Sequence, residues 1–533
     1  MSLIEKALRK PSYILFTLWI LLSLLHLRPA RLSYGYVYEG DDRIYLAQLS
    51  SLVIKGSFNY GREGSFNYLY YPVGSSLLAL PGYAAGYALD RLTRNTAGLW
   101  AERSYAFTWT IVGYIMNQQV FVILGLLSFF YALRRILQVP LTPALLATIA
   151  LLASHLPLYI FRRPIAHNAS FMLSAFFCAW WLKGVWTLRT EWRYTLLGSL
   201  LTGVILATRW NNLQYVALGV IPLAMPLFEK NTQTQPLLWR RVLAQISVYL
   251  IVSGLVFYAL QGPYWWAQFQ TLWPDMSRDL QAVHSRLERP FSWNGFRFLV
   301  HVLVGADFGL LWTAPVILAG LLAAYPALKI IFNQRAPAFA GPLALLTVGL
   351  FYGLSFFIVM QWRTQASYYG YRYLTSCLVP SALFVAVYLF KLQSQSRTLF
   401  RQVAACGVLA IGIGFITAIP FEANPTTLTL SPGHNKYGGE GWINSRYTVN
   451  AWKSMLMPMT PARTVMAGPA GMPLGLYVAS RADHPINASL EPLREKYLPF
   501  AEAGKRTYLI FATLLLLAPG LLFLSPMGRK FDA

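Results

Sequence analysis

Residues 114–135 have the sequence YIMNQQVFVILGLLSFFYALRR, which is twenty residues without a charge followed by two arginines. An α-helix rises about 1.5 Å per residue and the hydrocarbon core of a bilayer is about 30 Å thick, so this run has the length of a membrane-crossing helix. Arginines gather on the cytoplasmic side of such helices. The stretch therefore predicts a transmembrane helix whose end at Arg134 and Arg135 faces the cytoplasm.

Apolar runs of similar length recur along the whole chain. They cover residues 12–27, 114–133, 141–160, 168–188, 194–207, 211–228, 242–261, 306–325, 341–360, 373–390, 403–419 and 508–524. Because 56% of the residues are hydrophobic and only 12% are charged, these runs predict an all-α polytopic membrane protein with about 12 transmembrane helices. The short runs 194–207 and 211–228 form either a tight helical hairpin or one broken segment.

The charges between the runs set the predicted orientation. With the N-terminus inside, the inner loops carry the basic residues Arg134, Arg135, Lys183, Arg189, Arg193, Lys230, Arg240, Arg241, Lys329, Arg335, Lys391, Arg397, Arg401, Arg529 and Lys530. This pattern follows the positive-inside rule and predicts a multi-pass protein of the inner (plasma) membrane with both termini in the cytoplasm. Counting the apolar stretch 73–89 as a span would invert every later loop. Because Pro81, Gly82 and Gly86 also interrupt it, we predict that it lies along the membrane face or dips into it.

All the long polar segments then fall on the outer side of the membrane, at 28–113, 261–305, 361–372 and 421–507. We predict three parts: a transmembrane module at 1–420 that includes the first outer loop 28–113, an outer segment at 421–507, and a final helix with an inner tail at 508–533. The net charge is +24, but the basic residues sit between apolar segments, as membrane topology requires, so nucleic acid is not an expected partner. The three cysteines lie within apolar runs and indicate neither a disulfide framework nor a CxxC metal site.

An acidic pair opens the first outer loop, in Tyr38-Glu39-Gly40-Asp41-Asp42-Arg43-Ile44-Tyr45. Two adjacent carboxylates at a membrane surface are unfavourable unless cations or a proton accompany them. One interpretation is a catalytic pair at Asp41 and Asp42. The other is a solvated turn or a cap for a helix over residues 44–54.

Three basic clusters share the predicted outer face. The residues that they contribute as candidate phosphate ligands are Arg162, Arg163, His167, Arg209 and Arg372. Arginine suits this role because its planar guanidinium keeps its charge and matches phosphate oxygens. The alternatives are that the arginines at 162 and 163 extend to lipid headgroups and that the histidine caps a helix. An arginine between two apolar segments, as at position 209, is costly unless it meets an anion or carbonyl groups.

Other polar residues on this face are weaker candidates. Tyr45 and Tyr369 are candidate contacts for a sugar or acceptor, although aromatic residues are common at membrane interfaces. Asp307 begins an apolar run and is either such a contact or a helix cap. Pro315, within the same run, predicts a kink. The chain has no Walker A, GxSxG or HExxH motif, and its scattered histidines have no zinc spacing.

The first outer loop resembles that of GT-C glycosyltransferases, polytopic enzymes that use polyprenyl-phosphate-linked sugars and include the protein O-mannosyltransferases and aminoarabinose transferases. The resemblance rests on Gly40-Asp41-Asp42-Arg43-Ile44-Tyr45 with Lys55-Gly56, on residues 71–81, and on the later stretches 203–209, 312–315 and 370–374. It covers the chain to about Pro380 and fades afterwards. It implies a bundle with juxtamembrane helices in its outer loops, and it implies that Asp41 is the catalytic base. This chain has Asp-Asp where Asp-Glu is commoner, which leaves the role of Asp42 open.

The predicted function is transfer of a sugar from a polyprenyl-phosphate donor, a membrane lipid, to an acceptor on the outer face. A carboxylate would take the proton of the acceptor hydroxyl, and arginines would hold the leaving phosphate. A divalent metal at Asp41 and Asp42 is left open, since the sequence places no third carboxylate beside them. The alternative is a flippase for a lipid-linked glycan or a polysaccharide transporter, which would place ionisable groups near the middle of the membrane. The identities of the sugar and acceptor are not predicted.

Overall fold

The computed structural model describes residues 42–60, 71–94, 108–152, 166–187, 191–209, 212–229, 236–271, 290–304, 309–362 and 372–423, with the backbone alone at 42–43, 236, 312–313, 361–362, 372–373 and 413–423. The α-helices are α4 (Asp42–Lys55), α5 (Gly74–Leu92), α6 (Trp109–Tyr131), α7 (Leu141–Leu152), α9 (His167–Thr187), α10 (Trp192–Thr208), α11 (Gln214–Ala224), α12 (Pro236–Phe269), α14 (Trp293–Val304), α15 (Leu310–Thr313), α16 (Pro315–Asn333), α17 (Ala340–Val348), α18 (Leu354–Trp362), α19 (Leu378–Gln395) and α20 (Arg397–Ala423). Short 3-10 or π segments extend them: η3 (Ala132–Ile136), η5 (Met225–Phe228), η6 (Pro337–Phe339), η7 (Gly349–Gly353) and η8 (Arg372–Cys377). No strand occurs among the described residues, which agrees with the predicted all-α class.

Where the structure describes them, the predicted apolar runs are mainly helical, and the exceptions include Gly309 and Ala314 in the run 306–325. Among the described residues, five helices are long and apolar enough to cross a membrane: Trp109–Ile136, Leu237–Phe269, Pro315–Asn333, Pro337–Met360 and Leu374–Gln395. The helices α7 and α11 with η5 are apolar but shorter. The runs 12–27 and 508–524, and nearly all of segment 421–533, lie outside the described residues. The total of twelve spans stays a prediction.

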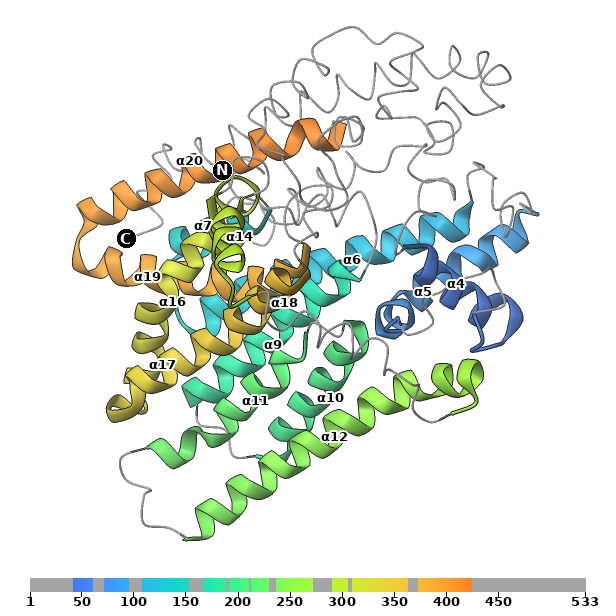
Figure 1. Cartoon of the computed structure of the whole chain (residues 1–533), viewed down its shortest axis with the longest axis horizontal. Helices are drawn as coiled ribbons and strands as arrows, with labels where there is room; N and C mark the ends of the chain where they lie inside the picture. The colour runs from blue at the N-terminus through green and yellow to red at the C-terminus, as the bar shows by residue number, and fades with distance from the viewer. Residues whose placement is uncertain are drawn as a thin grey trace, which may run out of the picture.

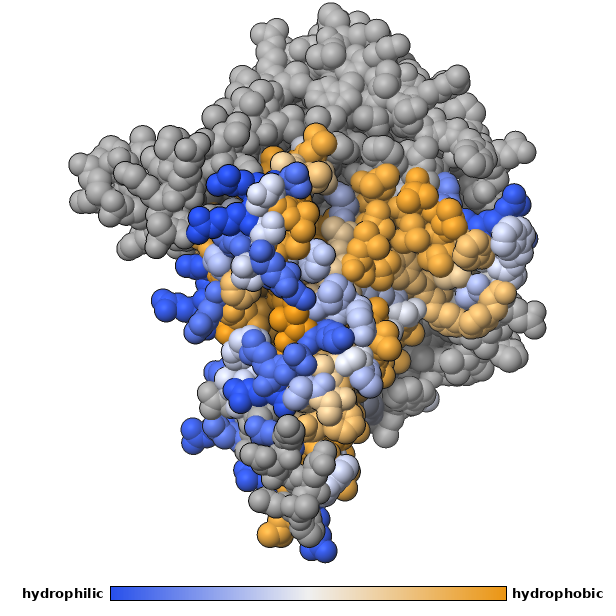
Figure 2. Space-filling view, turned by 90° about the vertical axis from the view of Figure 1, so that its left-hand side faces the viewer, coloured by the Kyte–Doolittle hydropathy of each residue, from blue (hydrophilic) through white to orange (hydrophobic). Residues whose placement is uncertain are grey.

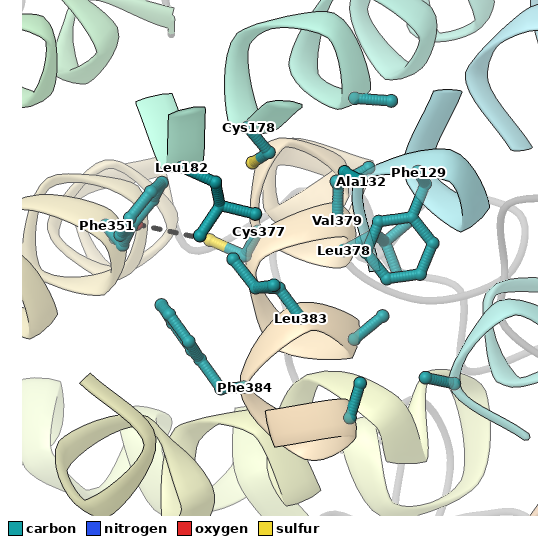
Figure 3. Close-up of a cluster of buried hydrophobic side chains, with 14 of the residues drawn as sticks. Phe129, Ala132, Cys178, Leu182, Phe351, Cys377, Leu378, Val379, Leu383 and Phe384 are labelled. Atoms are coloured by element: carbon teal, nitrogen blue, oxygen red, sulfur yellow. Dashed lines mark hydrogen bonds between the residues drawn. The ribbon is translucent and has the colours of Figure 1, made fainter. Parts of the chain in front are cut away.

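The hydrophobic core joins α6, α7, α9, α16 and α19, which pack side by side (Figure 1). Cys178 and Cys377 are both buried there, and the Cys377 thiol donates to the carbonyl of Phe351 at 3.4 Å (Figure 3). Leu378, Leu383 and the other labelled side chains of this cluster are apolar. The cysteines therefore act as small hydrophobic residues, as their positions in apolar runs predicted.

The stretch 73–89 is one continuous helix, α5, which passes through Pro81 and packs antiparallel against α6. A Cβ atom at Gly86 would collide with the carbonyl of Trp109, and one at Gly82 would lie 2.5 Å from the Cβ of Asn117. The glycines that suggested an irregular stretch therefore serve close approach of two helices, which requires residues without a side chain. Whether α5 lies along the membrane face stays a prediction.

The predicted run 306–325 is displaced in the structure. Helix α16 begins at Pro315 and continues to Asn333, and the short α15 precedes it. Proline lacks an N–H and has a fixed φ, so it fits the first turn of a helix, where that N–H has no partner. Pro315 thus starts a helix instead of kinking one, and the prediction of a kink was wrong.

Loops that were predicted to lie on the same side of the membrane are close together in the structure. Helices α4 and α5 lie where α6 begins and α12 ends (Figure 1). At the other end of the bundle, Arg335 after α16 donates through Nε to the carbonyl of Trp186 in the last turn of α9, at 3.1 Å. Figure 2, which views the molecule from the left of Figure 1, shows hydrophilic residues gathered beside hydrophobic surface. The structure therefore brings together loops that charge assigned to the same side.

Candidate functional site

The candidate site starts from two predicted residues that lie side by side. His167 is the first residue of α9, and Arg209 follows the last residue of α10. The guanidinium Nη1 of Arg209 donates to Nδ1 of His167 at 2.6 Å. Arginine has no acceptor, so Nδ1 must carry the lone pair, and the ring is neutral with its proton on Nε2. The histidine is buried and the arginine is half-buried.

Two further contacts continue this pair along α9. Ser170 bonds Asn212, with its Oγ 3.1 Å from Nδ2 of that amide. Tyr215 bonds Ser174, with 2.7 Å between the hydroxyl oxygens. Residues three and seven positions along a helix lie on the same face as the first, so α9 presents one polar stripe to the turn between α10 and α11. We call these six residues the polar seam: His167, Ser170 and Ser174 with Arg209, Asn212 and Tyr215.

Asn212 fixes the position of Arg209. Its Nδ2 also donates to the carbonyl of Ile205 at 3.2 Å, in the last turn of α10. The backbone N–H of Arg209 donates to the same carbonyl at 3.4 Å, while Arg209 itself is extended, with φ −159° and ψ 132°. The carbonyl of Ile205 thus accepts two hydrogen bonds in the last turn of α10, one from the backbone of Arg209 and one from the Asn212 amide. The amide holds the chain where it leaves α10 towards the histidine.

The seam reaches the segment that carries Arg372. The Tyr215 hydroxyl lies 2.9 Å from the carbonyl of Ser376 in η8, and η8 begins at Arg372. A carbonyl can only accept, so the phenol donates to it and the Ser174 hydroxyl donates to the phenol. Tyr215 therefore connects α9, which begins at His167, to η8, which begins at Arg372. The side chain of Arg372 lies outside the described part.

The first outer loop packs against the same end of the bundle. Helix α4 begins at Asp42, and one turn later Tyr45 is buried against Ala166, the residue before His167. Ser76 of α5 donates to the carbonyl of Tyr45 at 3.2 Å. A Cβ at Gly74 would stand 2.9 Å from the backbone nitrogen of Thr208, which shows how closely α5 approaches the end of α10. Three predicted residues, Tyr45, His167 and Arg209, therefore gather around one junction.

The end of α12 holds the first outer loop in place. This helix has 34 residues, so at about 1.5 Å per residue it is about 51 Å long and exceeds the hydrocarbon core. Its Gln261 accepts from the backbone N–H of Val73 at 3.1 Å, and the carbonyl of Ala267 accepts from Asn59 at 3.0 Å. Burial raises the pKa of Tyr60 to about 12, against opposing hydrogen bonds from Gln268 and other neighbours. Tyr60 therefore stays protonated at neutral pH.

Asp90, in the predicted first outer loop, has a buried side chain with a structural role. Asp90, near the end of α5, accepts from the backbone N–H groups of Trp109 and Thr110 at 2.9 and 2.8 Å and from the Thr110 hydroxyl at 2.5 Å. These N–H groups begin α6, where a helix lacks internal acceptors and its dipole favours a negative charge. Both carboxylate oxygens are engaged. The structure thus gives Asp90 a capping role.

The described residues test only part of the predicted site. Tyr45, His167 and Arg209 come together as set out above, and the backbone places Asp42 and Arg372 at the starts of α4 and η8. Outside the described residues lie Asp41, Arg162, Arg163, Asp307 and Tyr369. Among the described residues, no group of three or more His, Cys, Asp or Glu could hold a metal ion, and the side chains of Asp41 and Asp42 are not among them.

Sequence reasoning missed the residues that support the site. Asn212 lies three residues after the predicted phosphate ligand Arg209 but was not predicted to have a role, and neither were Ser170, Ser174 and Tyr215. The spacing of His167, Ser170 and Ser174 was a usable signal, because polar residues at i, i+3 and i+7 share a helix face. Their partners could not be found in the same way, since Asn212 lies 42 positions from Ser170.

Comparison with protein-family models finds no match, and comparison with curated proteins finds none either. Among solved structures, the chain is similar to ArnT from Cupriavidus metallidurans in the apo state, with 16% identity, TM-score 0.40, and coverage of 95% of this chain and 75% of that one. It is also similar to ArnT from Cupriavidus metallidurans bound to undecaprenyl phosphate, with 17% identity, TM-score 0.39, and coverage of 95% of this chain and 76% of that one. A third similar structure is the Archaeoglobus fulgidus oligosaccharyltransferase in complex with zinc and sulfate, with 11% identity, TM-score 0.38, and coverage of 82% of this chain and 60% of that one. These similarities are at low sequence identity, between 11% and 17%.

Proposed function

We propose that this protein is an integral-membrane glycosyltransferase that transfers a sugar from a polyprenyl-phosphate donor to an acceptor on the outer face of the membrane. Asp41 is the base in this proposal, and Arg209 and Arg372 hold the donor phosphate, together with Arg162 and Arg163. His167 orients Arg209. The proposed arrangement has the GT-C architecture with about twelve spans and cytoplasmic termini.

One observation carries the proposal. Tyr45, one turn after the acidic pair begins α4, packs against Ala166, and the adjacent His167 accepts a hydrogen bond from Arg209. An acid-bearing loop and a guanidinium from a remote helix end therefore meet at one end of the bundle. Transfer from a lipid phosphate needs both groups close together, a carboxylate for the acceptor proton and a cation for the leaving group.

The reaction follows from these roles. The acceptor hydroxyl oxygen attacks the anomeric carbon while the carboxylate of Asp41 takes the hydroxyl proton. The bond between that carbon and the phosphate oxygen breaks through an oxocarbenium-like centre, and its electron pair leaves with the polyprenyl phosphate. The guanidinium groups stabilise the charge that develops on the phosphate. Attack opposite the leaving group inverts the anomeric configuration.

The distribution of charge favours this enzyme over a flippase or transporter. In the helices that the structure describes, every Lys, Arg, Asp and Glu lies in the first two or last two turns, as Lys183 does in α9 and Lys329 in α16. A transporter for a charged substrate needs ionisable groups near the membrane centre. Polar groups that gather at one end of a bundle suit chemistry at that surface.

The test is the substitution Asp41→Asn in a reconstituted transfer assay. It keeps the size of the side chain and removes the proton acceptor, so we expect turnover to fall about a hundredfold or more while donor binding survives. Asp42→Asn should cost less if Asp42 only orients its neighbour or caps α4. Full activity of Asp41→Asn would refute the assignment. Equal and complete loss in both variants, with activity restored by raised divalent cation, would indicate a shared metal site instead.

A further inference from the structure

Gln214, the first residue of α11, has a buried amide with one end unused. The side chain is 2% exposed, and its Oε1 accepts from the Ser355 hydroxyl at 2.9 Å. Its Nε2 has no hydrogen-bond partner among the residues that the structure describes. A buried N–H without an acceptor is unfavourable, and nearly all such groups in folded proteins are paired. A bound ligand can supply the acceptor that the described residues do not.

The amide is the end of a directed hydrogen-bond chain. An amide oxygen can only accept, so the single proton of Ser355 points to Gln214. The Ser376 hydroxyl, 3.3 Å away, then donates to Ser355. Donors aligned in this way polarise one another, which makes the last N–H a stronger donor. The chain starts in η8, the segment that begins at Arg372, and ends at the first turn of α11.

The open N–H lies next to the polar seam. Tyr215, the following residue, belongs to the seam, and Arg209 stands five residues earlier at the end of α10. The preceding residue, Leu213, is 57% exposed, so the chain passes from the surface to the interior between Leu213 and Gln214. The first N–H groups of α11 add the positive end of a helix dipole to the same place.

From this geometry we infer that Gln214 is a binding residue for the donor, and that its Nε2 donates to a non-bridging oxygen of the lipid phosphate. The inference rests on the proposed function and adds a neutral donor to the arginines. The inference also explains the hydrogen bonds that join η8 to α11. Ser376 and Ser355 connect the segment that begins at Arg372 to Gln214, which follows Arg209 by five residues. A phosphate oxygen suits this donor because it is a charged acceptor.

The experiment measures equilibrium binding of two lipids to the purified full chain in detergent. Undecaprenyl phosphate is the probe, and undecaprenol, which has the same tail without the phosphate, is the comparison. We expect Gln214→Met to weaken binding of the phosphate lipid about tenfold to a hundredfold and to leave binding of the alcohol unchanged. Gln214→Glu should do at least as much, because it keeps the oxygen that Ser355 needs and replaces the donor with an acceptor. The matched control is Gln393→Met in α19, at the opposite end of that helix from η8, where a half-buried glutamine has a buried amide oxygen with no partner among the described residues.

The outcomes separate this inference from the proposed function. If Arg209→Ala loses the phosphate lipid while both Gln214 variants bind it like the wild type, a water serves the amide and the inference fails alone. If Gln214→Met weakens binding but Gln214→Glu does not, the free atom is the oxygen and the assignment is also overturned. If all these variants bind like the wild type, the phosphate does not bind at this end and the proposed donor site fails too. A lowered thermal midpoint with unchanged binding would mark Gln214 as purely structural.

Discussion

At the scale of single residues, two aspartates of the predicted first outer loop differ, because the structure gives Asp90 a capping role and Asp41 is the proposed base. Asp90 is 1% exposed, and its carboxylate oxygens accept three hydrogen bonds at the start of α6. An acid in this state has no free oxygen for an acceptor proton. Asp41 precedes the first residue of α4 in the sequence and is the proposed base. The two should respond to substitution in opposite ways.

We expect Asp90→Ala to lower the free energy of unfolding by about 2 kcal/mol, because it leaves buried N–H groups of α6 without an acceptor. Asp41→Asn should leave that free energy unchanged while it lowers turnover. Denaturant titration of both variants in mixed micelles measures the difference. An Asp90→Ala protein as stable as the wild type would contradict the capping role.

At the scale of elements, close contacts between helices decide where the first outer loop lies. Helix α5 has glycine where it meets α6 and where it meets the end of α10. A Cβ at Gly74 would stand 2.6 Å from the carbonyl carbon of Ala207, a backbone atom that cannot turn aside. Because Arg209 follows two residues later, the position of α5 is coupled to the position of that guanidinium.

We therefore expect Gly74→Ala to push α5 away from α10 and to reduce turnover about tenfold or more. The matched control is Gly254→Ala in α12, where a new Cβ would meet nothing within 4 Å. That change should leave turnover intact and raise stability by up to about 1 kcal/mol, since alanine favours a helix. Transfer assays and unfolding curves of both variants provide the measurements. Unchanged turnover in Gly74→Ala would show that the position of α5 does not affect the proposed site.

At the scale of the whole molecule, the bundle has two unlike ends. One end gathers α4, α5, the start of α9 and the polar seam. The other carries exposed basic residues after or before helices, such as Arg335, whose guanidinium meets the end of α9. Positive charge at one end predicts that this end faces the cytoplasm. The segment 421–507 would then lie on the outer side with the proposed site.

The orientation is tested by labelling a single cysteine. In a chain whose exposed Cys406 has been replaced by serine, we expect Ser431→Cys to react with an impermeant thiol reagent added to intact cells. Cys178 and Cys377 are buried and should stay unlabelled. A second variant with a cysteine at Ser394, in the last turn of α19, should react only after the membrane is opened. Labelling of Ser431→Cys only in opened cells would refute the predicted topology.

The sequence by itself determined the helices and the ends at which their polar residues gather. The described apolar runs are mainly helical, and Gln261, where a span was predicted to end, accepts a hydrogen bond from Val73 of the predicted outer loop. This was possible because span length and flanking charge are local properties, set by the thickness and the asymmetry of a bilayer.

The tertiary structure alone decided which polar groups are paired. His167 and Arg209 are 42 positions apart, and Tyr215 and Ser376 are 161 apart, so no local spacing could join them. The same holds for Asp90, whose capping role depends on the approach of α5 to α6. A side chain's partner is set by neighbours that only folding brings together, and a buried polar group is favourable or costly according to that partner.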